Sequence, residues 1–264
     1  MSGARILGPR SGICPAAALL GAALVLLPGD ARAAGQAADA QADAEHTAQK
    51  EEMPFKATAG IYRYSGGALG FDVNLRYSSW LGNLWAGYYD SNDTDQRQGR
   101  VGWDRVFVLG PVRVLPTAQW ASGGFLGGAV AAEVGWPWFV GGGYGRTNEK
   151  PYVNLNFDPN DAWLVSAGHR GEDGSVAMLQ WIIGERINQD QQVVHAIYRR
   201  PLAGGNRLTL DVSYKHGPVE GETISKVGAS VGYDWPRFYV RIAWDPKVNF
   251  TSDDMWRMQI GMRF

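Results

Sequence analysis

From Lys56 to the C-terminus, apolar residues alternate with polar or very small residues. In the segment 255–264, every second position from Trp256 to Phe264 is apolar, and the positions between them include two arginines, a glutamine and a glycine. A helix would place arginine on all its sides, whereas a strand separates the two sets onto opposite faces. The same rhythm recurs over 71–78, 207–215, 226–234 and 238–245. The pattern predicts amphipathic strands of about ten residues each.

Short segments rich in Gly, Pro, Asn and Asp separate these strands and predict turns. The turns fall at 65–67, 90–98, 109–111, 122–124, 158–161, 171–174, 204–206 and 217–222, and at two Trp-Pro-x-Phe corners, 136–139 and 235–238. About fifteen segments qualify as strands, and no connection between them is expected to exceed about nine residues. The alternation is least regular over 125–160, where Gly141–Gly143 interrupts it.

The composition of the two faces favours a membrane barrel over a soluble sandwich. The apolar faces carry Trp and Tyr near strand ends, where such rings suit the two membrane–water interfaces. The opposite faces mix Gly and Ala with Arg and Asp, which suits a crowded interior. Because a sheet in a bilayer must bond all its backbone groups, it closes on itself. We predict an all-β fold, an antiparallel transmembrane β-barrel with short turns and 14 strands, or 12 as the alternative even number.

The first part of the chain differs from the rest. Arg5 and Arg10 precede an apolar stretch, Ile13–Leu27, which is followed by the small-residue pattern 31–33. This order is typical of a secretory signal peptide, so residues 1–33 are assigned to it. Cys14, the one cysteine, would be removed with the signal, which excludes disulfides and thiol chemistry in the mature chain. Residues 34–55 lack an apolar stripe and are interpreted as a flexible periplasmic lead-in, and 56–264 as the barrel.

The terminal strand Met255–Phe264 resembles the last strand of bacterial outer-membrane β-barrel proteins, an alternating segment that ends in phenylalanine. The resemblance is at the level of the class and covers roughly 56–264. It implies a bacterial outer-membrane location, contact with outer-membrane lipid, and recognition by the barrel-assembly machinery. In that comparison, Phe264 is the assembly signal.

Arginine dominates the basic residues, with 19 Arg among the 25 Lys and Arg of the chain. The arginines predicted to line the pore are Arg76, Arg100, Arg113, Arg207, Arg241, Arg257 and Arg263. The acidic residues predicted on the same faces are Asp72, Asp104, Asp211, Asp234 and Asp245. One interpretation is that these charges pair across strands and brace the lumen. The other is that the arginines attract anions. The resulting hypothesis is a porin-like channel for passive passage or binding of small polar, anionic solutes.

Two further hypotheses belong to other classes. One is a structural or assembly role in envelope polysaccharide export, with 34–54 as the periplasmic contact. The other is a hydrolase, since outer-membrane phospholipase A places a serine two residues after its catalytic histidine. Here Gly171 occupies that position after His169, so no catalytic residue is predicted. No two histidines have metal-ligand spacing, and the net charge of −1 gives no basic footprint for nucleic acid, so no metal, cofactor or nucleic-acid partner is expected.

Overall fold

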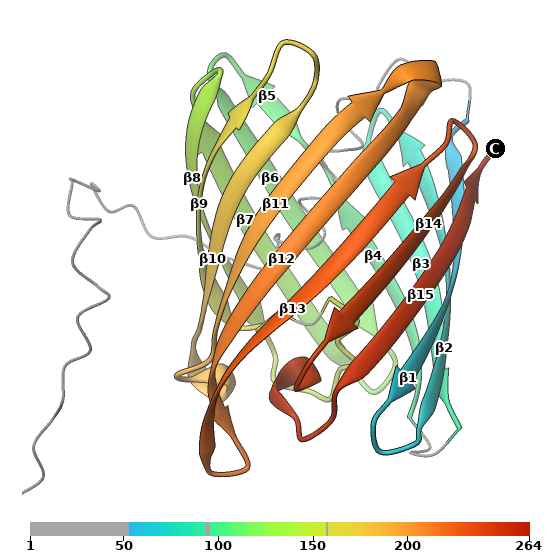
Figure 1. Cartoon of the computed structure of the whole chain (residues 1–264), viewed down its shortest axis with the longest axis vertical. Coiled ribbons are helices and arrows are strands. Elements are labelled where there is room, and N and C mark those ends of the chain that lie inside the picture. The colour runs from blue at the N-terminus through green and yellow to red at the C-terminus, as the bar shows by residue number, and fades with distance from the viewer. Residues whose placement is uncertain (1–52, 93–95, 157) are drawn as a thin grey trace, which may run out of the picture.

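The computed structural model describes residues 53–92, 96–156 and 158–264, and these form one antiparallel sheet (Figure 1). Its strands are β1 (Phe55–Tyr64), β2 (Leu69–Ser79), β3 (Gly82–Ser91), β4 (Arg97–Asp104), β5 (Phe107–Leu109), β6 (Val112–Ala121), β7 (Phe125–Val134), β8 (Trp138–Thr147), β9 (Ala162–Arg170), β10 (Val176–Gly184), β11 (Gln192–Leu202), β12 (Asn206–Val219), β13 (Glu222–Asp234), β14 (Phe238–Asp245) and β15 (Met255–Arg263). Three short 3-10 turns are η1 (Arg186–Asn188), η2 (Ala203–Gly205) and η3 (Val248–Phe250). Within the described ranges, no helix is long and apolar enough to cross a membrane.

The sheet closes into a barrel of 14 wall strands, which confirms the predicted number. Strands β4 and β5 both pair with β6, and the chain between them, 105–106, leaves the ladder. They therefore occupy one position in the wall, although they appear as two segments. The structure therefore has fifteen strand segments but 14 positions in the wall.

The barrel closes where the first and last strands meet. Strand β1 pairs with β15 along its length, from Lys56 opposite Arg263 to Tyr64 opposite Met255. Beyond the ladder, Phe55 and Phe264 exchange two backbone hydrogen bonds of 2.9 and 3.0 Å, and their rings stack with centroids 5.6 Å apart. Phe264 is thus part of the closing seam, while its role as an assembly signal stays a prediction. The predicted signal peptide and nearly all of the predicted lead-in lie outside the described residues.

The outer wall is apolar and the inner wall carries the charges. Side chains such as Val73, Leu75, Ile242 and Ile260 are exposed on the outside, whereas Asp72, Arg76 and other polar groups of the same strands are buried inside. Outward aromatic residues gather near both ends of the barrel. Near the chain termini these are Tyr77, Trp80, Trp103, Trp136, Trp138, Tyr198 and Trp235, and near the opposite end Trp120, Trp163, Trp181, Tyr214, Trp244 and Trp256. This distribution confirms the predicted membrane-type faces.

The two ends of the barrel differ in the length of their connections. At the terminal end, where β1 starts and β15 stops, the turns are two to five residues long. The opposite end, here called the loop end, carries 185–191, 246–254 and a 14-residue loop from 148 to 161, which is described except for residue 157. The expectation that no connection exceeds about nine residues was therefore wrong. Within this loop, Leu155 and Val153 pack inside the barrel rather than in its wall.

The predicted turn at 217–222 was also too long. Strand β12 continues through Gly217 to Val219, and the turn is confined to Glu220 and Gly221 (Figure 1). Residues 217–219 pair with 222–224 of β13, so this hairpin extends beyond its neighbours. A Gly-Pro pair signals a turn in general, but here the ladder partners of β13 hold the segment extended.

Inner-wall aromatic rings lie on glycines of neighbouring strands. The Trp85 ring of β3 covers Gly102 of β4 so closely that a Cβ atom on Gly102 would overlap the indole. Gly99, on the same strand, has no heavy atom near the position of its missing Cβ. A side chain at position 102 would therefore clash with the Trp85 ring, whereas a side chain at position 99 would meet no neighbouring atom.

Replacing Gly102 with alanine is expected to lower the free energy of unfolding by about 1–3 kcal/mol, because the Trp85 ring must move. Urea titration of the folded protein in lipid vesicles would measure this. Gly99→Ala is the matched control on the same strand and is expected to change stability by less than about 0.5 kcal/mol. Equal stability of the two variants would contradict the argument.

Candidate functional site

The inner wall divides into an apolar part and a charged part. On one side, Leu115, Ala131, Ala162, Leu164 and Ile182 of β6, β7, β9 and β10 form a buried cluster. The charged part follows β1–β4 and β11–β15, which lie next to one another around the closure of the barrel. The charges are therefore concentrated on one side of the lumen, and sequence alternation alone did not predict this.

Several charges on the inner wall form ion pairs across strands. Arg100 binds Asp72, Arg76 lies 3.3 Å from Asp104, and Lys215 lies 2.5 Å from Asp245. Asp234 accepts from both Arg207 (3.3 Å) and Arg263 (2.5 Å). On the other side of the lumen Arg170 binds Glu133. These pairs agree with the bracing interpretation of the inner charges.

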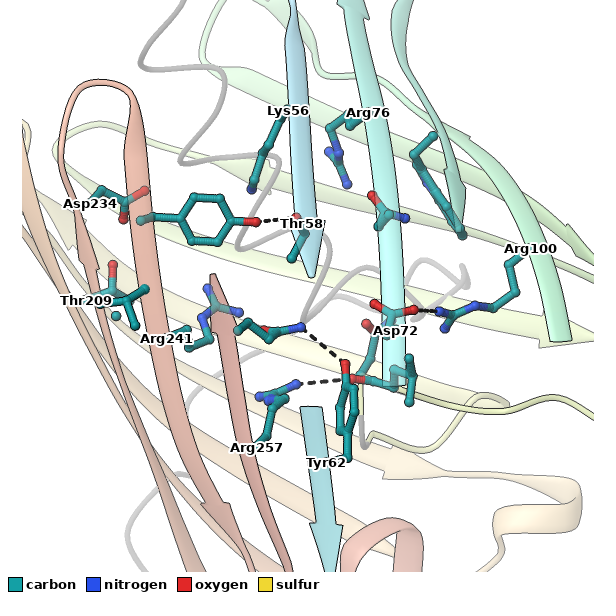
Figure 2. Close-up of a pocket in the computed structure, with 18 of the residues that line it drawn as sticks. Lys56, Thr58, Tyr62, Asp72, Arg76, Arg100, Thr209, Asp234, Arg241 and Arg257 are labelled. Atoms are coloured by element: carbon teal, nitrogen blue, oxygen red, sulfur yellow. Dashed lines mark hydrogen bonds and ion pairs between the residues drawn. The ribbon is translucent and has the colours of Figure 1, made fainter. Parts of the chain in front are cut away.

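A cavity of about 150 Å³ lies against the charged wall (Figure 2). Its basic lining residues are Lys56, Arg76, Arg100, Arg199, Arg207, Arg241 and Arg257. Its acidic lining residues are Asp72 and Asp234. Figure 2 shows Arg241 and Arg257 entering from one side and Arg76 and Arg100 from the other. Among the described residues around this cavity, cationic groups therefore outnumber carboxylates. This still holds when Asp104, the ion-pair partner of Arg76, is included.

Tyrosine and amide groups add neutral hydrogen-bonding atoms to the same cavity. The Tyr62 hydroxyl accepts from Gln259 Nε2 at 3.2 Å, and the hydroxyls of Thr58 and Tyr239 are hydrogen-bonded to each other. Lys56 Nζ lies 4.8 Å from the centre of the Tyr239 ring, a cation–π contact. The cavity is thus polar on most sides and offers donors of several kinds.

The loop 148–161 folds into the lumen and closes one side of this cavity. Tyr152, Leu155 and Asn156 of the loop are among its lining residues. Leu155 is buried in a cluster with Tyr62, Tyr89, Val248 and Met255. The loop therefore contacts the far wall instead of projecting away from the barrel.

Polar contacts fix the loop to four strands of the wall. The Gln98 side chain of β4 donates to Pro151 O (3.1 Å) and accepts from Val153 N (2.8 Å). The Tyr152 hydroxyl donates to Gln119 Oε1 of β6 at 3.3 Å, and Arg257 Nη1 of β15 donates to Leu155 O at 3.2 Å. Asp158 is held by His195 of β11. The loop is thus bound on opposite sides of the lumen.

The base of the loop is clamped separately. Asp161 accepts from the backbone N–H (3.1 Å) and the hydroxyl (2.6 Å) of Thr147 and also binds Arg186. Arg186 Nη1 lies 2.7 Å from Glu149 as well. The hydrogen bond that Arg186 donates to Asp161 raises the pKa of the Arg186 guanidinium above its usual value, with the charges of Asp161 and Glu149 adding to the effect. The clamp therefore keeps its positive charge at every pH at which the protein would be studied.

The connection 246–254 meets the inward loop at the loop end. Asn249 Nδ2 donates to Asn154 O at 2.8 Å. Phe250 is buried against Val193 and Val219, and Lys215 Nζ donates to Lys247 O at 3.3 Å. Lys247, Asn249 and Phe250 all have positive φ. Two connections therefore pack together over this end of the lumen.

The twelve charged residues predicted to line the pore all lie on the inner side of the wall, but they are not all at one site. The cavity brings together Asp72, Arg76, Arg100, Arg207, Asp234, Arg241 and Arg257. The remaining five, Asp104, Arg113, Asp211, Asp245 and Arg263, lie elsewhere on the inner side. Whether any of them lines a path for solute stays a prediction.

Sequence reasoning missed Lys56, Arg199 and His195, and the loop contacts Gln98 and Gln119. The alternation could have placed His195 and Arg199 on the inner face. Both lie an even number of positions from Val193, whose side chain points inward. Their inward neighbours Val193 and Ile197 hid that signal, because apolar and charged side chains share the inner face of β11.

His169 lies on the outer wall, where its ring packs against Trp138 with centroids 4.7 Å apart. His216 hydrogen-bonds Ser225 at the rim, and His195 is buried inside. Among the described residues, no group of three or more His, Cys, Asp or Glu side chains is arranged to hold a metal ion.

No protein-family model matches the chain, and no curated protein matches it in sequence. Among solved structures, the outer membrane protein Omp33 of Acinetobacter baumannii is similar, with a TM-score of 0.52 and 12% identity over 80% of this chain and 98% of that chain. The NanC porin gives 0.45 and 8% over 79% and 100%, and the KdgM porin, solved with disordered oligogalacturonate, gives 0.40 and 9% over 79% and 99%. At such identities the likeness shows the fold alone. The chain has the barrel fold of bacterial outer-membrane proteins.

Proposed function

We propose that this protein is an outer-membrane channel for the passive passage of small anionic solutes. The observation that carries the proposal is the cavity beside the inward loop, where seven basic side chains face two carboxylates. An exposed apolar wall with aromatic residues near both ends supports placement in a bilayer. Short turns at one end and longer connections at the other fit periplasmic and extracellular sides respectively.

Charge and geometry together favour anions over cations in this lumen. A guanidinium binds carboxylate or phosphate oxygens through two parallel N–H groups, and rings of arginine make anion-selective pores. Asp72 and Asp234 are already bound to Arg100, Arg207 and Arg263, which limits their attraction for a cation. The net field in the cavity therefore concentrates small anions.

Arg241→Ser is expected to lower the anion-to-cation permeability ratio about five-fold, since one unit charge at about 8 Å in water stabilises an anion and destabilises a cation by about 0.5 kcal/mol each. Adding Arg257→Ser should lower the ratio further. Reversal potentials in planar bilayers under a salt gradient measure this directly. Arg200→Ser, which removes an equal charge from the outward face of β11, is the matched control and should leave the ratio unchanged. A cation-selective wild type, or a folded protein that does not conduct, would refute the proposal.

A further inference from the structure

His195 lies between two carboxylates that come from different parts of the fold. Its Nδ1 atom is 2.9 Å from Asp211 Oδ1 on β12, the neighbouring strand. Its Nε2 atom is 3.0 Å from Asp158 Oδ1 on the inward loop. The side chains of His195 and Asp158 are 14% and 12% exposed, so water does not readily replace either contact. The ring thus joins the loop to the wall.

The two contacts require a particular protonation state. A neutral imidazole has one N–H donor, whereas the imidazolium ion has two. Only the charged ring can donate to both carboxylates at once. Loss of the proton would place a bare nitrogen against a carboxylate oxygen. Because Asp211 is fixed in the wall, the bond to Asp158 on the loop is the one that would open.

The other charged groups around His195 already have partners of their own. In the small cavity beside it, Lys215 of β12 binds Asp245 of β14 at 2.5 Å, and Arg257 of β15 donates to the loop carbonyl of Leu155. Gln180 of β10, opposite His195 in the ladder, is neutral. His195 is therefore the cation that holds Asp158.

We propose that His195 is the positioning residue of the inward loop, and that it holds the loop across the lumen only while its ring is protonated. The inference deepens the proposed function, because the position of the loop affects transport only if the lumen conducts. The other contacts of the loop include hydrogen bonds with Gln98, Gln119, Arg257 and Asn249 and the packing of Leu155, and none of these groups titrates near neutral pH. A rise in pH should therefore loosen the loop through His195.

Loop mobility can be measured without reference to conductance. A nitroxide attached to Asn156→Cys would report on the loop, since the described residues contain no other cysteine. In the otherwise unchanged protein we expect an immobilised spectrum at about pH 7 and a mobile component at about pH 10. His195→Gln should be mobile at both pH values, with the ratio of bound to released loop reduced at least about 100-fold. His195→Arg, which keeps two donors and does not titrate, should be immobilised at both.

Two further variants keep the test decisive. His216→Gln, which removes an exposed histidine at the rim, should behave as the parent does. Asp158→Asn removes the same contact from the loop side without altering the wall, and its loop should be mobile at both pH values even if His195→Gln fails to fold. An identical pH response in the parent and in His195→Gln, or a loop immobilised in Asp158→Asn, would overturn the proposal. A protein that shows the expected spectra but no conductance would refute the channel function and leave the role of His195 intact.

Discussion

Replacing residues 148–159 by an Asn-Gly turn is expected to raise single-channel conductance several-fold. The loop crosses the lumen, buries Leu155 against the far wall, and is bonded to β4, β6, β11 and β15. Strands β8 and β9 are paired at Gly145 and Ala162, so a two-residue turn suits the shortened hairpin. Asp161 and its bonds to Thr147 remain in place. Removing the loop would widen the path without removing any wall strand.

Conductance in planar bilayers measures this effect, and heat-modifiable gel mobility shows that the barrel is folded. The wall groups that the loop leaves, such as Gln98 and Gln119, would face a water-filled lumen and can bond water instead. A matched control replaces Glu220 and Gly221, the turn between β12 and β13, with the same Asn-Gly pair and should leave conductance unchanged. Unchanged conductance in a folded loop-deleted barrel would show that the loop is not the constriction.

Replacing Arg170 with methionine is expected to lower the free energy of unfolding by about 3 kcal/mol, because it leaves a buried carboxylate without its nearest cation. Arg170 and Glu133 are bound to each other, with side-chain exposures of 2% and 9%. The guanidinium also lies 3.8 Å from the centre of the Phe139 ring. Arg113, opposite Glu133 in the ladder, limits the loss but does not replace the packing on Phe139.

The chain offers a matched control in a second Arg–Glu pair. Arg146 and Glu185 lie 3.1 Å apart, but their side chains are 45% and 38% exposed. Because water solvates both groups, Arg146→Met should cost about 0–1 kcal/mol. Urea unfolding in lipid vesicles compares the two variants under one condition. A similar loss of stability in both would mean that burial does not determine the strength of these pairs.

The fold could be predicted from the sequence because the information is local. In β15, the alternation of Trp256, Met258 and Ile260 with Arg257 and Gln259 fixes which side meets lipid, whatever the neighbouring strand. The two sides of β2 and β14 separate for the same reason. The number of wall strands followed from these periods and from the even number of strands that a closed antiparallel barrel requires.

The inner architecture was decided by tertiary structure. Nothing in the sequence near 148–161 indicates that its partners are Gln98, His195 and Arg257, which lie tens of residues away in the chain and are near the loop only in the closed barrel. The pairing of Asp158 with His195 likewise depends on a loop crossing a lumen whose width is set by all strands together. Local periodicity determines the faces of a strand, since each residue's side follows from its neighbours. Contacts across a closed interior depend on distances that no single segment contains, so the cavity, its charge balance and the loop that bounds it came from the three-dimensional structure.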